Sequence, residues 1–287
     1  MKPAPFSFLR PQRLEHALEA LAADPGSKVL AGGQSLVPLL NMRLAAPTTL
    51  VDINGLPDLG QVRVDASGVR VGALARHADV LASSDVRRVQ PLLSLALQHV
   101  AHATIRNRGT VVGSLVHADA AAELPAVLAL LGGAVVATST RGSREIAAAD
   151  LFAGPLESTV AHDEIAVEAF FPALAPGEGV GFAEIARRHG DYALCGVAAV
   201  VRVAEGQVAA ARGGYLSVAD VPTVVDLAEP LRGGVTDAAL AAAGALALTS
   251  LDPADDIHAT AAYRGRLVEV LTARVLRAAY EDARSRA

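Results

Sequence analysis

The spacing of apolar residues in the first part of the chain predicts short strands that alternate with helices. Leu14, Leu18 and Leu21 recur at the helical period shortly after Pro11, which predicts a first helix with proline near its start. Short apolar runs between polar turns predict strands, and longer periodic runs predict helices. The predicted strands are 28–31, 49–53, 68–74, 134–138 and 164–171, and the further predicted helices are 36–44, 78–82, 91–101 and 123–131.

The pattern changes beyond residues 171–181, a stretch rich in proline and glycine that predicts an interdomain linker. The next apolar runs predict antiparallel strands, followed by helices with a polar face. These strands are 182–188, 193–203 and 207–218, the last pair joined by a turn at Glu205-Gly206, and the helices are 237–248 and 259–283.

We therefore predict an α+β fold divided between residues 176 and 177. Residues 1–176 are expected to form two subdomains, about 1–55 and 56–176, and residues 177–287 a C-terminal domain with a three-stranded sheet and helices. A chain of 287 residues, 52% of them hydrophobic, is long enough for two or more domains with cores of their own.

Charge and hydropathy exclude two classes of partner. The net charge is −5 and the chain has no long basic run, whereas nucleic acid binding needs clustered Lys and Arg. The longest uncharged stretch, 124–140, contains Gly132-Gly133 and is shorter than a membrane span of about 18 to 20 apolar residues. The N-terminus lacks the apolar core of a secretory signal. We expect a cytoplasmic protein with no transmembrane segment.

The chain has a single cysteine, Cys195. It is expected to form no intrachain disulfide and to hold no iron-sulfur cluster, because such clusters need several thiolates. Cys195 is predicted to be a small buried residue of the strand over 193–201. His99 and His102 have a spacing that can ligate a metal, but no cysteine or carboxylate set lies near them in the sequence, so capping or solvent exposure is expected and no metal site is predicted.

A first glycine segment follows the predicted strand 28–31. Glycine lets a backbone approach a diphosphate closely because it has no Cβ, and it reaches positive φ easily, so successive amide N–H groups can converge on an anion. Ser35 is a good N-cap for the next helix, and a helix start adds a positive dipole end. An ordinary strand-to-helix turn explains the segment equally well. Its residues are Ala31, Gly32, Gly33, Gln34, Ser35 and Leu36.

A second glycine segment, around Gly109 and Gly113, lies about eighty positions later. It contains two hydroxyl side chains that can donate to phosphate oxygens. No lysine stands beside either glycine, and no segment matches the P-loop or Rossmann pattern, so a nucleoside triphosphate site is not expected. Together the two segments predict two halves of one cradle for the diphosphate of FAD. The candidates in this half are Thr110, Val111, Gly113 and Ser114.

Three segments also resemble a known family, the FAD-binding medium subunit of molybdenum hydroxylases, which includes aerobic carbon monoxide dehydrogenase and xanthine-dehydrogenase-type enzymes. In family order they are AGGQSLVPLLNMRLAAPTTLVDIN, ATIRNRGTVVGSLVHADAAAELPAVLALLGG and EIARRHGDYALCGVAAVV. The resemblance covers nearly the whole chain. It implies a two-subdomain FAD-binding fold of the vanillyl-alcohol oxidase type (PCMH-like), followed by a C-terminal domain of the carbon monoxide dehydrogenase flavoprotein type that closes over the flavin.

The sequence departs from the family pattern at two positions. Val112 stands where the family usually has the first glycine of a pair, and Ala120 stands where a proline usually follows His-Ala-Asp. Because valine avoids positive φ, the loop must accept an extended residue there or shift slightly. We expect the cradle to persist with looser phosphate contact.

The resemblance implies roles for three residues outside the glycine segments. Glu123 matches a carboxylate that contacts the adenosine ribose, although an acidic residue in the first turn of a helix is also favoured by the helix dipole. Ala166 would offer backbone groups to the pyrimidine edge of the flavin. Tyr192 would cover the flavin face and restrict entry of oxidant, or it anchors the strand that follows.

The function implied by the resemblance is electron relay. Flavin accepts electrons singly or in pairs, which suits transfer between iron-sulfur centres and a two-electron acceptor. Substrate would be oxidised on a large molybdopterin subunit, and electrons would pass through a small subunit with two [2Fe-2S] clusters to FAD on this chain and then to an external electron acceptor. The expected complex is a dimer of heterotrimers. The alternatives are a self-contained FAD-dependent oxidase or reductase of the same fold, and a non-enzymatic FAD-binding subunit. No catalytic residue is expected on this chain, where Tyr192 would act only as a gate over the flavin face.

Overall fold

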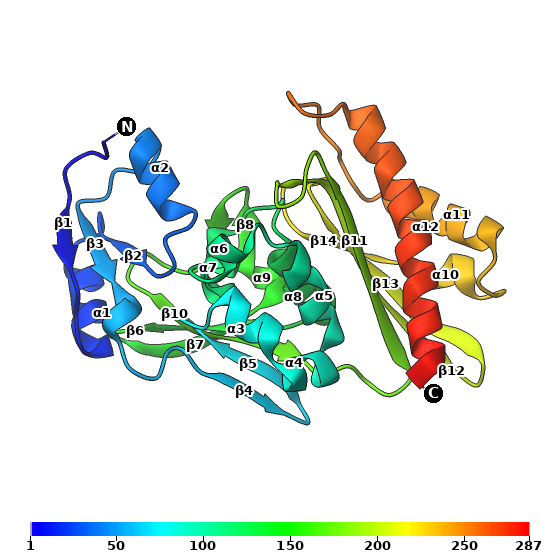
Figure 1. Ribbon diagram of the computed structural model, residues 1–287, viewed down its shortest axis with the longest axis horizontal. Coiled ribbons are helices and arrows are strands. Elements are labelled where there is room, and N and C mark those ends of the chain that lie inside the picture. The colour runs from blue at the N-terminus through cyan, green and yellow to red at the C-terminus, as the bar shows by residue number, and fades with distance from the viewer. Residues whose placement is uncertain (1, 287) are drawn as a thin grey trace.

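The computed structural model describes residues 2–286 and places helices between and beside three main β-sheets (Figure 1). The first sheet is parallel, with the strand order β1-β3-β2. Its strands are β1 (Ser7–Leu9), β2 (Lys28–Leu30) and β3 (Thr49–Asp52), and its helices are α1 (Leu14–Ala23), α2 (Leu36–Met42) and the 3-10 helix η1 (Ile53–Gly55). Parallel neighbours need crossover connections, which α1 and α2 supply. The segments after β2 and β3 therefore meet at one sheet edge.

The second sheet is antiparallel around its central strand β10. Its order is β4-β5-β10-β6-β7, so a strand late in sequence pairs between two earlier hairpins. The strands are β4 (Val62–Asp65), β5 (Gly68–Gly72), β6 (Ala134–Ser139), β7 (Gly142–Ala147) and β10 (Ile165–Pro172), with a small ribbon of β8 (Phe152–Gly154) and β9 (Glu157–Ser158) beside them. Burial of Phe171 and Val71 on this sheet follows from the apolar alternation of its strands.

A layer of helices separates the second sheet from the third (Figure 1). Its members are α3 (His77–Ala82), α4 (Ser84–Val89), α5 (Pro91–His99), α6 (Ala103–Arg106), α7 (Val111–His117), α8 (Glu123–Leu131) and α9 (Ala148–Leu151). Leu92, Leu97 and Leu128 are fully buried in this layer. The same core extends to Ala198 and Val200 on the third sheet, so helices α5 and α8 join the two parts of the chain.

The third sheet has four strands, where three were predicted. They are β11 (Glu178–Ala186), β12 (Ala193–Ala204), β13 (Gln207–Leu216) and β14 (Thr223–Asp226), in sequence order. The prediction missed β14 because it has four residues and only Val225 among them is buried, too short an alternation to stand out. Helices α10 (Ala228–Leu231), α11 (Asp237–Leu248) and α12 (Ala261–Arg286) pack on the outer face.

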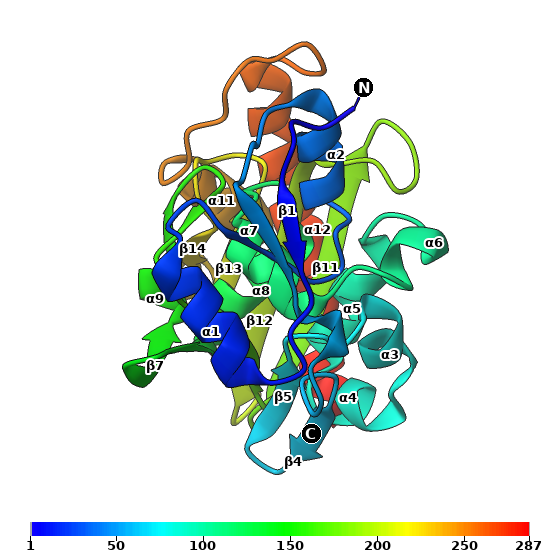
Figure 2. The ribbon, with the colours of Figure 1, turned by 90° about the vertical axis from the view of Figure 1, so that its left-hand side faces the viewer.

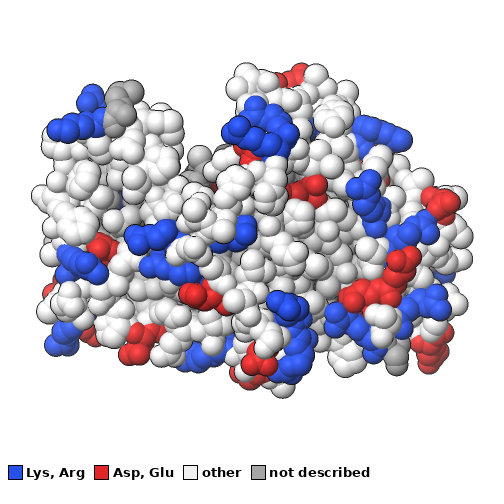
Figure 3. All heavy atoms as spheres, in the orientation of Figure 1, with Lys and Arg blue, Asp and Glu red and all other residues white. Residues whose placement is uncertain are grey.

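The predicted linker over 171–181 is shorter than expected, because Pro172 ends β10 and Glu178 begins β11. The α+β class is confirmed, while the boundary between residues 176 and 177 stays a prediction. Figure 2 shows the parallel sheet from outside, with α1 in front and α2 at the top. The face in Figure 3 is notched between the region of α2 and the start of α12, and it mixes charges of both signs. Over residues 2–286 no helix is long and apolar enough to cross a membrane.

Candidate functional site

The two glycine segments lie against each other. A Cβ placed on Gly32 would lie 2.8 Å from the Gly109 Cα and closer still to the Arg108 carbonyl oxygen. Only glycine permits this approach of two backbones. Gly33 has a φ of 73°, in the left-handed region that glycine adopts without strain. The segments therefore meet in space, as one shared cradle requires, and their binding of a diphosphate stays a prediction.

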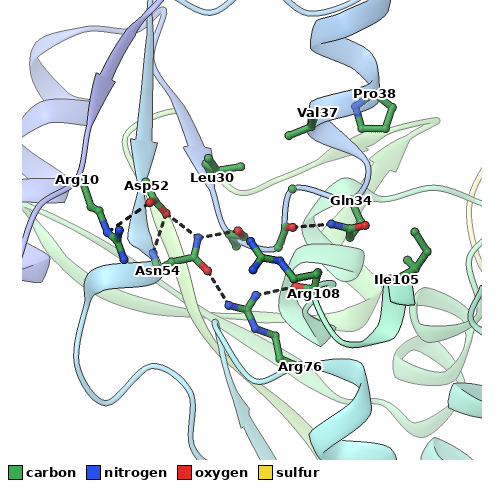
Figure 4. A pocket seen from close by; sticks show the side chains of 13 residues that line it. Arg10, Leu30, Gln34, Val37, Pro38, Asp52, Asn54, Arg76, Ile105 and Arg108 are labelled. Carbon is green, nitrogen blue, oxygen red and sulfur yellow. Dashed lines mark hydrogen bonds and ion pairs between the residues drawn. The ribbon is translucent and has the colours of Figure 1, made fainter. Parts of the chain in front are cut away.

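A pocket of about 640 Å³ opens beside the first segment (Figure 4). Four of the predicted residues, Ala31, Gly32, Gly33 and Gln34, line it. The other lining residues are Arg10, Leu30, Val37, Pro38, Asp52, Asn54, Arg76, Ile105 and Arg108. Three arginines against one aspartate make the wall cationic, which favours an anionic ligand.

The backbone of the first segment offers hydrogen-bond donors to a ligand. The amides of Gly33, Gln34 and Ser35 donate to no acceptor within the part of the chain that the structure describes. The side-chain amide of Gln34 donates to the Gly32 carbonyl at 3.1 Å and stabilises the turn. Successive free N–H groups at a turn form an anion-binding concavity, so this backbone fits a phosphate.

Ser35 occupies the N-cap position of α2, as predicted, but its side chain does not cap the helix. Ser35 has φ and ψ of −98° and −45°, already helical, and its side chain makes no capping bond. The Val37 N–H donates to the Gly33 carbonyl at 3.0 Å, so the helical turn begins before Ser35. Leu36 is the first residue of α2, which ends at Met42 because Arg43 takes a left-handed φ of 60°.

The second glycine segment leads into helix α7. Thr110 is the N-cap, and its Oγ1 accepts from the Gly113 N–H at 3.1 Å. A Cβ on Gly113 would lie 2.6 Å from that oxygen, so this glycine makes room for the cap. Val112 lies in the first turn of α7 with its side chain in the core, so it needs neither positive φ nor a shifted loop. Of the predicted residues Thr110, Val111, Gly113 and Ser114, none lines the 640 Å³ pocket.

Glu123 is the first residue of α8, as expected for an acidic residue at a helix start. Burial and the nearby charges of Glu184 and Asp119 raise the pKa of Glu123 to about 8. The Glu184 carboxylate lies on β11, with Oε1 3.4 Å from the His99 Nδ1. Glu123 is therefore mainly protonated at neutral pH and can both donate and accept hydrogen bonds.

Tyr192 borders a second pocket of about 340 Å³, where its side chain is largely exposed. This pocket lies between the loop of Asp119 and Ala120 and the C-terminal sheet. The Ser217 N–H donates to the Ala120 carbonyl at 2.8 Å and connects this loop to the C-terminal sheet. Tyr192 therefore lies between the loop and the C-terminal sheet and not in the first pocket.

Ala166 belongs to the buried strand β10, where it pairs with Ala137 of β6. A bulge follows, at which the Val167 carbonyl accepts from the Ala73 N–H at 2.9 Å. Neither pocket includes Ala166. Its predicted contact with a flavin stays a prediction.

The sequence reasoning missed four polar residues that line the first pocket: Arg10, Asp52, Asn54 and Arg76. Asp52 lies near the end of the predicted strand 49–53 and begins an Asp-x-Asn-Gly turn with Asn54, which was an available signal because Asp side chains often bond the backbone two residues on. Arg76 carries no local signal of this kind.

Cys195 and His99, both considered in the sequence, lie in different surroundings. Cys195 lies fully buried on β12, as predicted, and burial raises the pKa of its thiol to about 12. The His99 ring packs against the Phe182 ring at a tilt of 48°, with the ring centroids 5.1 Å apart. Across residues 2–286 no three His, Cys, Asp or Glu side chains are grouped to hold a metal ion.

Comparison with known proteins identifies the family. Residues 4–174 match the model of the FAD binding domain in molybdopterin dehydrogenase, and residues 181–279 match the CO dehydrogenase flavoprotein C-terminal domain. The chain is 41% identical to the 6-hydroxypseudooxynicotine dehydrogenase complex subunit alpha of Paenarthrobacter nicotinovorans, over 99% of this chain and 97% of the relative.

Solved structures of similar proteins support the same family assignment. The chain superposes with a TM-score of 0.94 on quinoline 2-oxidoreductase from Pseudomonas putida 86, at 36% identity and 99% coverage of both chains. It superposes with a TM-score of 0.92 on carbon monoxide dehydrogenase from Hydrogenophaga pseudoflava, at 32% identity, covering 98% of this chain and 99% of that one. The chain therefore belongs to the family of FAD-binding medium subunits of molybdenum hydroxylases.

Proposed function

We propose that this chain holds the diphosphate of FAD where its two glycine segments meet. The observation that carries the proposal is the contact of Gly32 with the Arg108 and Gly109 backbone, next to free amides of the first segment. These donors, the positive φ of Gly33 and the cationic pocket wall all fit an anionic bridge between two nucleotide halves. The proposed FAD-binding residues are Ala31, Gly32, Gly33, Gln34, Ser35, Leu36, Thr110, Val111, Gly113, Ser114, Glu123, Ala166 and Tyr192.

Bound FAD supplies the chemistry, because flavin exchanges electrons singly with iron-sulfur centres and singly or in pairs with an acceptor. The protein binds and orients it. Free amides neutralise the diphosphate charge without a lysine. The protonated Glu123 carboxyl suits ribose hydroxyls, since it can donate to one oxygen and accept from another. We propose that the Tyr192 ring, exposed at the second pocket, limits access of small oxidants to the flavin.

The proposed partners are a large molybdopterin subunit, on which substrate is oxidised, and a small subunit with [2Fe-2S] clusters. An external acceptor takes the electrons from FAD. Support comes from the relatives, which are named as subunits, and from Cys195, a single buried cysteine that leaves no thiolate set on this chain to hold a cluster. A dimer of heterotrimers located in the cytoplasm is the proposed assembly.

Purification of the chain from its native extract tests the relay. We expect a yellow complex that carries molybdenum and iron in fixed ratio to FAD, and in which reduction of the iron-sulfur centres is followed by flavin reduction. A yellow protein that lacks both metals and oxidises a substrate alone would favour the self-contained oxidase. A colourless, folded chain that takes up no FAD even with its companion subunits would overturn the proposal.

A further inference from the structure

Two side chains connect the glycine segments across the wall of the first pocket (Figure 4). The Asn54 Nδ2 donates to the Ala31 carbonyl at 2.8 Å, and the Arg76 Nη2 donates to the Asn54 Oδ1 at 2.7 Å. The Arg76 Nη1 then donates to the Arg108 carbonyl at 2.6 Å. Ala31 directly precedes Gly32, and Arg108 directly precedes Gly109. The connection therefore joins the two segments at equivalent positions.

The orientation of Asn54 is fixed by its surroundings. The buried Asp52 carboxylate accepts from the Asn54 Nδ2 at 2.6 Å and from the Asn54 backbone N–H at 3.0 Å. Arg10 lies 3.5 Å from the other oxygen of Asp52. Both amide hydrogens and the amide oxygen of Asn54 are thus used, and a flipped amide would place its oxygen against the Ala31 carbonyl and the Asp52 carboxylate.

The backbone on either side of Arg76 holds the second segment as well. The His77 N–H donates to the Gly109 carbonyl at 3.0 Å, and the Val111 N–H donates to the Ala75 carbonyl at 3.3 Å. Arg76 also forms an isolated β-bridge with Thr110. The backbone around Arg76 is therefore hydrogen-bonded to the second glycine segment, while the Arg76 side chain bonds to Asn54.

We propose that Asn54 and Arg76 are positioning residues that set the separation of the two glycine segments. The inference rests on the proposed binding of FAD between these segments. Contact between Gly32 and the Arg108–Gly109 backbone sets the closest approach of the segments. The Asn54–Arg76 connection limits how far they can move apart, because it is hydrogen-bonded to a carbonyl in each. The two limits together define the width available to a diphosphate.

The chemistry of arginine matters at position 76. A planar guanidinium presents several N–H groups in a rigid fork, so it can donate to the Asn54 amide and the Arg108 carbonyl at once. A lysine ammonium is a compact charge on a flexible stem and does not hold two acceptors at a fixed separation. Replacement by lysine therefore separates the geometric role of Arg76 from its charge.

The test measures the dissociation constants of FAD and of riboflavin on the chain after flavin removal. The variants are Arg76→Lys, Arg76→Met and Asn54→Ala. Arg13→Met is the matched control because, among residues 2–286, the Arg13 guanidinium pairs only with its exposed neighbour Glu15. We expect each of the three variants to bind FAD about tenfold to a hundredfold more weakly, as expected for loss of a hydrogen bond to a charged group. Riboflavin, which has no diphosphate, should bind as tightly as to the wild-type chain.

Further binding measurements distinguish a failure of the positioning role from a failure of the proposed FAD binding. The double variant Arg76→Met with Asn54→Ala should bind FAD no more weakly than the worse single variant, because both remove one connection. If Arg76→Lys binds FAD like the wild type while Arg76→Met does not, charge and not separation is the role, and the inference fails. Equal loss of FAD and riboflavin would indicate a general folding defect and would also overturn it. A wild-type chain that binds no FAD refutes the proposed function instead.

Discussion

Replacement of Gly32 by alanine tests whether the close contact of the two segments is needed for flavin binding. The new Cβ would lie 2.8 Å from the Gly109 Cα, about 1 Å short of the usual carbon–carbon contact of about 3.5 to 4.0 Å. Because the obstructing atoms are backbone, no side chain can rotate away. The segments must therefore separate, against the Asn54–Arg76 connection that holds them together.

The expected cost has two parts. Overpacking of this kind lowers the free energy of unfolding by about 1 to 3 kcal/mol. A separation of about 1 Å should also remove one charge-assisted hydrogen bond to the diphosphate, which costs about 1.5 to 3 kcal/mol and weakens FAD binding about tenfold to 150-fold. We therefore expect Gly32→Ala to lower both the melting temperature of the flavin-free chain and its affinity for FAD.

Equilibrium titration with FAD, followed by flavin fluorescence, and thermal unfolding without flavin give the two quantities separately. Gly60→Ala is the matched control, because a Cβ on Gly60 meets no atom of the described residues within 4 Å and Gly60 has no positive φ. It should leave both quantities unchanged. Wild-type affinity for FAD in Gly32→Ala, with an unchanged melting temperature, would refute the view that the two backbones must touch.

Three further predictions concern single residues. Glu123 has a pKa of about 8 in the folded state and about 4.5 in the unfolded state, so the folded state binds more protons between these values and stability falls as pH rises. In flavin-free protein, the free energy of unfolding of Glu123→Gln relative to the wild type should rise by about 3 to 4 kcal/mol between pH 5 and pH 8 in denaturant titrations, and parallel pH profiles would contradict this. The Cys195 thiol, buried and with its pKa raised to about 12, should react with a thiol reagent only as the chain unfolds in guanidinium, so rapid native labelling would be inconsistent with the burial of β12. A Cβ on Gly179 would lie 2.6 Å from the Ala283 Cα of α12, so Gly179→Ala should lower the free energy of unfolding by about 2 to 3 kcal/mol, whereas Gly233→Ala, in open space, should be neutral.

Most of the fold could be predicted because its apolar spacing is local. Helix α1 buries Ala17, Leu18 and Leu21 at the spacing that was noted, and helices α8 and α11 have the predicted bounds. Strand β1 was missed because it has three exposed residues and no alternation. Helix α7 was missed because Gly109 before it and Gly113 within it suggested a loop, although Thr110 is a typical N-cap before an apolar turn.

The glycine residues of the site could be predicted from the sequence, whereas the side chains that meet through long-range contacts could not. Gly32 and Gly33 carry a local signal, since a missing Cβ and a positive φ are properties of one residue. Ser35 has a side chain suited to capping and directly precedes α2, but its own backbone is already helical, so its hydroxyl forms no capping bond. Arg76 reaches Asn54 over 22 positions, and no periodicity or turn rule specifies that pair.

The two glycine segments lie on different structural units, which affects the energetics of flavin binding. The first segment belongs to the parallel sheet and the second to the helical layer beside the antiparallel sheet, so neither unit alone contains the whole site. A ligand that binds only when both are folded and docked adds its binding free energy to the docking of the two units. FAD should therefore stabilise the N-terminal unit against the rest of the chain, and weakening of the Asn54–Arg76 connection should reduce both the docking of the units and the affinity for FAD.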